Sequence, residues 1–378
     1  MSNASKKPVV VYGASGYTGR LVCEYLREYN IPFIAAGRSA EKLHAAMKSN
    51  VPGIETADFE VVEVPHTVEA LTELFRGASV VLNTVGPFAK FGHEVVRACL
   101  ATKCHYTDTT GEQDWLITLD QEYGAQFAAA GLLLSPGIAH MYTTGEIAAQ
   151  ICLETPGLDT LDIAVFWGGS PTIASTQTIL VNAATSKAFY LEQNKYVEWQ
   201  PDAGLYSLAI PGQHETALAL PWGGTSHPVW FKRDPRVANV KVLGGVFNKP
   251  LMLGVPQIVA AALKATEGMS DDEKYAALSA TASQVMNTMP PRENPRINKS
   301  VDSVHASGPL GRAHCTIFGN SNYKQTGLLQ AYAARSLLQG PPKKVGFASG
   351  CQAFGHHELL GALRSFGLVQ KPILTVDQ

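Results

Sequence analysis

Short apolar runs alternate with amphipathic segments along the first third of the chain. Residues 8–12 form an uncharged, β-branched run, typical of a parallel strand buried on both faces, and residues 21–26 carry apolar side chains at helical spacing. Further strands are predicted at 33–36, 59–64, 79–85, from 105 and at 132–135, with helices at 67–76 and 92–101. This alternation favours an α/β domain with a Rossmann-type, doubly wound parallel sheet.

The pattern changes after Pro136-Gly137. Residues 159–247 mix β-rich runs at 161–167, 229–231 and 240–242 with Gly and Pro turns, and helical periodicity follows at 251–265, 270–289 and 323–338. We therefore expect a dinucleotide-binding domain over residues 1–140. An inserted α+β domain with a mixed sheet, for substrate binding and dimerisation, is expected over 141–345, and residues 346–378 are expected to return to the first domain.

Composition narrows the function classes. Of the 378 residues, 46% are hydrophobic and only 16% are charged, and the net charge is −2. The balanced charge argues against a nucleic-acid partner. The low charge suits an apolar cleft or a subunit interface, so a homodimer is expected. Since no apolar run reaches the ~20 residues that a membrane span needs, no transmembrane segment is expected.

The cysteines and histidines show no metal-binding pattern. The six cysteines form no CxxC pair and no zinc-like spacing with histidine, so we expect reduced, mostly buried thiols in a cytoplasmic protein. Residues 1–7 lack the apolar core of a secretory signal. The run His356-His357-Glu358 resembles a ligand set, but adjacent helical side chains point about 100° apart, so no metal is expected.

A GxxGxxG motif separates the first strand from the first helix. Gly13 would permit the tight exit from the strand, Gly16 would let the backbone approach a pyrophosphate, and Gly19 would let the helix pack on the sheet. The phosphates would lie on the helix N-terminus. The alternative is a structural turn without a ligand. From this turn we assign to the cofactor site Gly13, Ser15, Gly16, Tyr17, Thr18 and Gly19.

The end of the second strand indicates which dinucleotide binds. An NAD site usually has a carboxylate here for the ribose 2′-OH, but this chain has Arg38 and Ser39, and no carboxylate before Glu41. Because a guanidinium suits a 2′-phosphate, we predict NADP(H). The alternative is that Arg38 stacks on adenine or is merely exposed.

Two further strands end in polar turns. In a doubly wound sheet, ligands lie beyond the carboxyl ends of the strands, so residues after the fourth strand should flank the nicotinamide ribose. These are Asn83, Thr84, Gly86 and Pro87. Asp108 and Glu112 follow the fifth strand and are candidate site carboxylates. Their alternative role is to cap the turn and the helix that begins near Gln113.

Three of these segments carry a family resemblance. GASGYTGR (13–20), VGPFAKFG (85–92) and HYTDTTGE (105–112) resemble the saccharopine dehydrogenase-like NADP-binding family, which includes trans-acting enoyl reductases. The resemblance is specific over residues 8–140 and looser over 323–338 and 346–368. It implies that Gly13, Gly16, Gly19, Arg38 and the 83–87 turn belong to the cofactor site. It leaves the substrate open, because members of the group differ there.

The middle of the chain argues against saccharopine itself as substrate. A substrate with several carboxylates favours bidentate arginines, yet residues 141–231 contain no arginine and only two lysines, Lys187 and Lys195. Seven aromatic side chains instead suggest a small apolar or aromatic substrate, although any one of them could be core. They are Trp167, Tyr190, Tyr196, Trp199, Tyr206, Trp222 and Trp230.

Catalytic groups are less clearly marked. Hydride transfer needs a proton donor for the atom that gains negative charge, and the chain lacks the Tyr-x-x-x-Lys pair of short-chain dehydrogenases. Residues 137–142 join the two halves and offer His140 and Tyr142. Lys187 and Tyr190 are rivals from the second domain. The alternative for His140 is a hydrogen-bonded interdomain residue.

These observations favour an NADP(H)-dependent reductase. It would transfer a hydride to a conjugated C=C bond or a carbonyl of a mostly apolar small-molecule or lipid-like substrate. One alternative is a dinucleotide-binding redox sensor or regulatory protein without catalysis. Another, which rests on the resemblance alone, is a trans-acting reductase partner of an assembly-line enzyme.

Overall fold

The chain divides into two compact units, each built from segments that are distant in sequence. The structure is a computed structural model that describes residues 7–200, 204–222 and 225–377, so most of the N-terminal segment 1–7 lies outside the described residues. The first unit comprises the residues up to Thr110, Trp115–Thr143 and Tyr323–Phe366. The second comprises Gly111–Asp114, Thr144–Asn322 and the residues from Gly367 onward.

These boundaries differ from the expected ones at the C-terminal end. Residues 323–345 lie in the first unit, because helix α12 (Asn322–Gln339) packs closely on the first helix. A Cβ atom on Gly327 of α12 would lie 2.8 Å from the Cβ atom of Leu21. Residues from 367 onward lie in the second unit, where strand β16 (Ile373–Asp377) pairs antiparallel with β14 (Arg312–Asn320).

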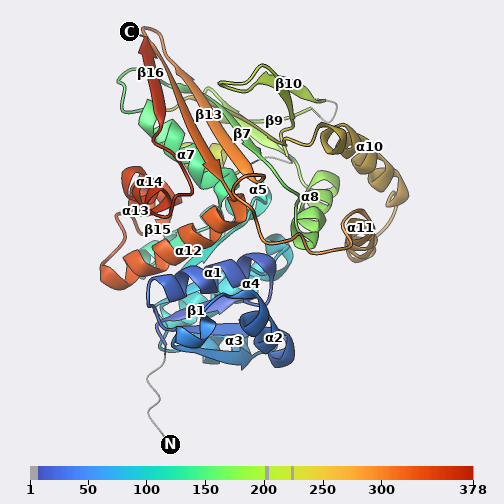
Figure 1. Cartoon of the computed structure of the whole chain (residues 1–378), viewed down its shortest axis with the longest axis vertical. Coiled ribbons are helices and arrows are strands. Elements are labelled where there is room, and N and C mark those ends of the chain that lie inside the picture. The colour runs from blue at the N-terminus through green and yellow to red at the C-terminus, as the bar shows by residue number, and fades with distance from the viewer. Residues whose placement is uncertain (1–6, 201–203, 223–224, 378) are drawn as a thin grey trace, which may run out of the picture. The chain divides into compact units, whose positions relative to one another are not determined.

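The first unit contains the predicted Rossmann-type sheet (Figure 1). Its seven strands are all parallel, in the order β15-β6-β5-β4-β1-β2-β3. The strands are β1 (Val9–Tyr12), β2 (Phe33–Gly37), β3 (Phe59–Glu63), β4 (Val80–Asn83), β5 (His105–Asp108), β6 (Leu133–Ser135) and β15 (Gly346–Phe347). The interior strand β1 is wholly buried, as its uncharged β-branched sequence predicts.

Helices follow these strands along the chain, and α7 continues from the first unit into the second. They are α1 (Tyr17–Glu28), α2 (Ala40–Asn50), α3 (Val68–Phe75), α4 (Phe88–Thr102), α5 (Gln113–Thr118), α6 (Gly124–Ala129), α7 (His140–Cys152), α13 (Gly350–Phe354) and α14 (His356–Ser365). Helix α4 begins four residues before the predicted start at Gly92, directly after Pro87. Gly92 lies inside the helix because the Trp115 ring packs against it: a Cβ atom there would lie 2.3 Å from that ring.

The second unit contains the predicted mixed sheet. Its order is β16-β14-β13-β7-β12-β8-β9, and only β7 and β12 are parallel to each other. The remaining strands are β7 (Thr160–Trp167), β8 (Phe189–Glu192), β9 (Lys195–Glu198), β12 (Asn239–Val246) and β13 (Lys299–Ser307). A separate two-stranded ribbon, β10 (Tyr206–Ala209) and β11 (Thr216–Ala219), packs on the sheet through Phe166, Ile210 and Val301.

The β-strand prediction for residues 229–231 is wrong. They end the short helix α9 (Ser226–Phe231), whose six side chains are all buried. A short apolar run fits a buried helix as well as a buried strand, and Pro228 in the first helical turn is compatible with a helix. The other helices of this unit are α8 (Ile173–Thr185), α10 (Lys249–Ala265) and α11 (Asp271–Val285), the last two close to their predicted positions.

A buried carboxyl group links α7 to β13. The hydroxyl of Thr144 donates to Oδ1 of Asp302 at 2.8 Å, and Asp302 is fully buried. Burial raises the pKa of Asp302 from 3.8 to about 8, although the Thr144 hydrogen bond lowers it in part. The carboxyl group is therefore protonated at neutral pH in the folded protein.

Within the described ranges, no helix combines the length and the apolar character that crossing a membrane requires.

The Asp302 site predicts a pH-dependent stability. Between pH 3.8 and about 8 the unfolded chain loses this proton and the folded chain keeps it, so the free energy of unfolding falls as the pH rises. In Asp302→Asn this contribution is absent. We expect the melting temperature of the variant to exceed that of the wild type by several degrees near pH 8 and to approach it near pH 4. Asp162→Asn, on an exposed position of β7, is the control and should leave the pH profile unchanged. Parallel profiles for wild type and Asp302→Asn would contradict this assignment.

Candidate functional site

The turn between β1 and α1 requires glycine at its first position. Gly13 has φ +92°, and its N–H donates to the carbonyl oxygen of Ala36 at 2.9 Å. A Cβ atom at Gly13 would also lie 2.7 Å from Oγ1 of Thr84, at the end of β4. Backbone conformation and space therefore both exclude a larger residue.

The same turn brings α1 unusually close to the strand. The N–H of Gly16 donates to the carbonyl oxygen of Gly13 at 3.0 Å. A Cβ atom on Gly19 would lie only 2.4 Å from this oxygen and 2.8 Å from the Cα atom of Ala14. The motif's third glycine thus permits the helix to begin directly at the carboxyl edge of the sheet.

The N-terminus of α1 has the properties of an anion site. Gly16 is the N-cap and supplies no side-chain cap, and the first turn contains no acidic residue. Its first N–H groups have no intrahelical acceptor and carry the positive end of the helix dipole. Ser15 accepts a hydrogen bond from Nε of Arg20 through its carbonyl oxygen at 2.8 Å, and the Tyr17 ring packs edge-on against Tyr323. Thr18 is half-buried in the first helical turn.

Arg38 directly follows β2 and is exposed. In the part of the chain that the structure describes, its guanidinium forms no ion pair. Burial raises the pKa of the neighbouring Tyr12 to about 12, and the positive charge of Arg38 opposes this shift. Ser39 caps α2, since its hydroxyl accepts a hydrogen bond from the N–H of Lys42 at 3.3 Å. Arg38 is thus the cation available beside the β2 carboxyl end.

At the end of β4, the polar residues divide into inward and edge positions. The fully buried Asn83 donates through Nδ2 to the Tyr106 hydroxyl at 3.1 Å and accepts from the N–H of Val85 at 3.0 Å. Thr84 binds the carbonyl oxygen of Tyr12 through both its N–H (2.8 Å) and its hydroxyl (3.0 Å). Gly86 is half-buried and Pro87, the N-cap of α4, is buried.

Asp108 is the centre of a buried hydrogen-bond network. Its Oδ1 accepts from the N–H groups of Thr110 (3.0 Å) and Gly137 (2.8 Å). Its Oδ2 accepts from the Tyr106 hydroxyl (2.7 Å) and from Nε1 of Trp115 (3.3 Å). Burial raises the pKa of Asp108 to about 6, against the lowering effect of these four donors. The carboxylate therefore points into the protein and fixes the residue 137 segment beside β5.

Gln330 of α12 completes this network. Its Nε2 donates to the carbonyl oxygens of Asp108 (2.7 Å) and Ile138 (2.9 Å), and its Oε1 accepts from the Thr107 hydroxyl. The Asp-x-Thr sequence at 108–110 is a recognisable Asx turn, but no local signal marks a glutamine more than 200 residues away.

The two candidate donors of the first unit differ in their environment. His140 begins α7, and its N–H binds the Thr326 hydroxyl at 3.1 Å. Its side chain is 1% exposed, and burial lowers the pKa of the imidazole to about 3. The ring is therefore neutral at physiological pH and is poorly suited to give up a proton. Tyr142, in the first turn of α7, is half-buried.

The two candidates of the second unit take part in surface contacts. Nζ of the exposed Lys187 binds Oε2 of Glu198 at 2.9 Å. The Tyr190 ring on β8 lies 4.9 Å from the Trp199 ring, and Nζ of Lys241 lies 4.9 Å from the centre of the Tyr190 ring.

The aromatic side chains of this unit fall into two groups. Trp167 and Trp230 are buried core residues, as the alternative for any single aromatic residue allowed. Trp199 also contacts Tyr206 of β10, at 6.2 Å between ring centres. The half-buried members are Tyr190, Tyr196, Trp199, Tyr206 and Trp222.

The structure thus brings most predicted cofactor residues to one sheet edge. The glycine turn, Thr84 and Gly86 lie at the carboxyl ends of the neighbouring strands β1 and β4, and Arg38 follows β2 on the other side of β1. Asn83 and Asp108 support this edge from inside the protein. The arrangement can hold a bound anion at α1 and a second anionic group beside β2.

Two family models match the chain. Residues 9–130 match the saccharopine dehydrogenase NADP binding domain, and residues 143–378 match a family of unknown function, DUF5938. The predicted resemblance and the predicted cofactor, NADP(H), are therefore confirmed: the chain carries an NADP-binding domain of the saccharopine dehydrogenase type.

Curated relatives match the N-terminal part. A lipid droplet localized protein of Caenorhabditis elegans is 36% identical over 135 residues, which are 34% of this chain and 32% of that protein. The human saccharopine dehydrogenase-like oxidoreductase is 32% identical over 139 residues (33% and 32%). A trans-acting enoyl reductase of Mycobacterium leprae is 37% identical over 108 residues (28% and 25%). The chain thus spans about a third or less of the length of these relatives.

A solved structure supports the fold across the chain. Apo saccharopine dehydrogenase (L-Glu forming) from Saccharomyces cerevisiae matches with a TM-score of 0.63 at 14% identity, covering 98% of this chain and 100% of that one. At this identity the match shows a shared fold.

The close contact at Gly19 predicts the effect of adding a single methyl group. In Gly19→Ala, α1 must move away from the Gly13 carbonyl oxygen, and we expect a loss of about 1–3 kcal/mol in the free energy of unfolding and a clear loss of NADPH affinity. Gly361→Ala is the matched control, because a Cβ atom in this part of α14 meets nothing within 4 Å. The control should gain about 0.5–1 kcal/mol and keep its affinity. Equal denaturation midpoints for the two variants would contradict the packing described for Gly19.

Proposed function

We propose that this chain, which belongs to the family of unknown function DUF5938, is an NADP(H)-dependent oxidoreductase. Its substrate would be a mostly apolar molecule that is reduced at a conjugated C=C bond or a carbonyl. The observation that carries the proposal is the sheet edge of the first unit. There a glycine turn opens α1 without an acidic residue in its first turn, and Arg38 stands where an NAD site has a carboxylate.

The residues at this edge fit a phosphorylated dinucleotide. The pyrophosphate would lie at the N-terminus of α1, against the N–H groups of Tyr17 and Thr18, with Gly16 allowing the backbone to approach. The guanidinium of Arg38 would bind the 2′-phosphate, for which it has charge and hydrogen-bond donors. Thr84 and Gly86 would flank the nicotinamide ribose. Bound NADPH would supply a hydride, and the protein would hold the dinucleotide in place and provide the proton.

The substrate class is proposed from the second unit. Its half-buried aromatic residues include a contact series from Tyr190 through Trp199 to Tyr206, which offers apolar surface with hydroxyl and indole N–H groups at its edges. The absence of arginine from residues 141–231 argues against a substrate bound there through several carboxylates.

Among the four candidate donors, Tyr142 is favoured. Its phenol can donate a proton, it is half-buried, and it lies in the first turn of α7, shortly after residues 137 and 138, which the Asp108 network holds beside β5. Burial keeps His140 neutral, Lys187 is paired with Glu198, and the Tyr190 ring packs against Trp199.

A trans-acting role and self-association are further proposals. The enoyl reductase relative is named as trans-acting, which suggests a substrate presented by another protein. The edge strand β16 exposes three large apolar residues, Ile373, Leu374 and Val376, which supports a homodimer. Sedimentation of wild type and Leu374→Lys would test the dimer.

Arg38 predicts the cofactor preference. We expect purified protein to bind NADPH more tightly than NADH in a direct titration. In Arg38→Ala the affinity for NADPH should fall about tenfold or more, because a charge-assisted contact to the 2′-phosphate is lost, while the affinity for NADH stays the same. Lys48→Ala, which removes an exposed cation from the last turn of α2, is the control and should behave as wild type. If both nucleotides bind equally well to the wild type, the role of Arg38 is wrong; if neither binds, the enzyme proposal fails.

Tyr142 predicts a separate effect on turnover. With an apolar enone or ketone that wild type reduces, Tyr142→Phe should lower kcat by about a hundredfold and leave KM and NADPH affinity nearly unchanged. Unchanged kcat in Tyr142→Phe would assign the proton to another group.

A further inference from the structure

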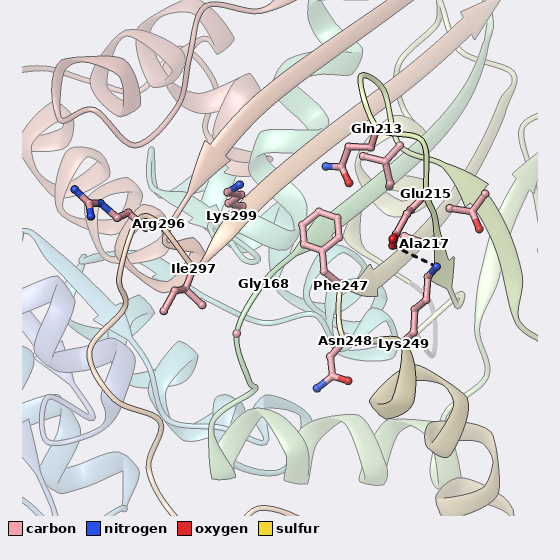
Figure 2. A pocket seen from close by; sticks show the side chains of 13 residues that line it. Gly168, Gln213, Glu215, Ala217, Phe247, Asn248, Lys249, Arg296, Ile297 and Lys299 are labelled. Atoms are coloured by element: carbon pink, nitrogen blue, oxygen red, sulfur yellow. Dashed lines mark ion pairs between the residues drawn. The ribbon is translucent and has the colours of Figure 1, made fainter.

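A cavity of about 580 Å³ lies wholly within the second unit (Figure 2). Gly168 and Gly169, directly after β7, and Phe247 and Asn248, directly after β12, line it. Because β7 and β12 are the parallel pair of this sheet, the cavity lies beyond the carboxyl ends of two parallel strands, where α/β proteins bind ligands.

One side of the cavity is a turn that is rigidly held. The side-chain Oδ1 of Asn294 accepts from the N–H of Arg296 at 3.0 Å, and the side-chain Oδ1 of Asn298 accepts from the N–H of Asn294 at 2.8 Å. The backbone N–H of Asn298 also donates to the Asn294 carbonyl oxygen at 2.8 Å. Two asparagines therefore close the turn, and the adjoining cations Arg296 and Lys299 extend from an ordered backbone.

The two glycines hold this turn against β7. The N–H of Gly168 donates to the carbonyl oxygen of Lys299 at 2.7 Å, and Nδ2 of Asn298 donates to the Gly168 carbonyl oxygen at 3.3 Å. A Cβ atom on Gly168 would lie 2.8 Å from the carbonyl oxygen of Ile297, and one on Gly169, at φ +101°, would lie 2.2 Å from Nδ2 of Asn298. Larger residues would displace the turn from the cavity wall.

The charges that line the cavity are unbalanced. Lys249 pairs with Glu215 across 3.6 Å on one side, marked by the dashed line in Figure 2, and Arg296 and Lys299 lie on the other side of Phe247. Over residues 7–200, 204–222 and 225–377, neither Arg296 nor Lys299 forms an ion pair. Three cations and one carboxylate therefore leave two positive charges uncompensated.

The cavity also has an apolar wall. Ile210 and Ala217 from the β10–β11 ribbon line it and belong to the buried core, and Phe247 packs against that core. Ile297 lines the opposite side and is 69% exposed. Uncompensated cations and apolar surface thus meet in one cavity that is large enough for a small ligand.

We propose that this cavity binds an anionic amphiphile, a carboxylate or phosphate joined to an apolar chain, with the anion on Arg296 and Lys299 and the chain on Phe247 and Ile297. A carboxylate and a phosphate both accept the donors that a guanidinium and an ammonium offer. Contact with the apolar chain stabilises the complex, because it removes the exposed Ile297 side chain and the Phe247 ring from water. The site uses residues that the dinucleotide site does not use.

The test is calorimetric titration of the full chain, at low ionic strength, with octanoate, octyl phosphate, inorganic phosphate and 1-octanol. We expect octanoate or octyl phosphate to bind more tightly than 1-octanol and inorganic phosphate, and to bind more weakly as salt is added. Tighter binding of octanoate than of octyl phosphate identifies a carboxylate head group, and the reverse order identifies a phosphate.

The variants locate the binding. In Arg296→Gln/Lys299→Gln, affinity for the better octyl ligand should fall about tenfold or more, because both charges that contact the anion are lost. Ile297→Ser should weaken the octyl ligands and leave inorganic phosphate unaffected. The matched control Lys264→Gln/Lys371→Gln removes two exposed cations of the same unit that lie outside the cavity, and it should bind as wild type.

Three results would overturn the proposal: no binding of either octyl anion, equal binding of 1-octanol, or equal losses in the cavity and control double variants. NADPH titration of the same variants separates these outcomes from a failure of the dinucleotide site, since substitution of Arg296 and Lys299 should leave the affinity for NADPH unchanged.

Discussion

The carbonyl oxygen of Gly13 fixes the start of the first helix, and the dinucleotide site depends on that position. The oxygen accepts the N–H of Gly16 and lies where any side chain at position 19 would have to be. Because Gly13 also adopts a left-handed conformation under Thr84, the turn is confined from the strand side and from the helix side at once. The helix can therefore point its first N–H groups beyond the sheet edge, between the ends of β2 and β4.

A second constraint maintains this edge from within. Asp108 accepts four hydrogen bonds, and Gln330 connects its backbone to Ile138. A fully satisfied buried network of this kind favours a single arrangement of its members, because each lost partner would leave a buried polar group without compensation. The network thus holds residues 137 and 138, which lead into α7, beside a strand of the cofactor domain.

The sequence predicts the first unit well because its signals are local. The periodicity of the hydrophobic residues, the spacing of the glycines and the absence of a carboxylate after β2 can all be recognised within about 30 residues. The sequence cannot provide the direction of a side chain at a strand end. Asn83 and Asp108 are residue types that often bind ligands, yet both side chains point inward. Helix α4 starts at Phe88, before the predicted position, for a related reason: Gly92 lies inside the helix against the Trp115 ring.

The second unit is less predictable because distant segments complete it. The run at 229–231 is compatible with a buried strand and with a buried helix, and the sequence alone does not show that it ends the buried helix α9. Likewise, the lack of arginine over residues 141–231 describes one stretch of sequence, whereas the cavity receives Arg296 and Lys299 from a turn more than 60 residues later.

The chain has 30 lysine and arginine residues against 32 acidic ones, so no general positive field attracts anions to either site. Both must act through cations and N–H groups at contact distance. Contacts of this kind are shorter than the Debye length, ~10 Å at ordinary ionic strength, so salt weakens them less than it weakens a long-range attraction. On a weakly charged surface, anion binding depends on where single cations are placed and not on the net charge. Binding at each site therefore depends on the backbone that holds its cation. This backbone is the β2 carboxyl end for Arg38 and the asparagine-closed turn for Arg296.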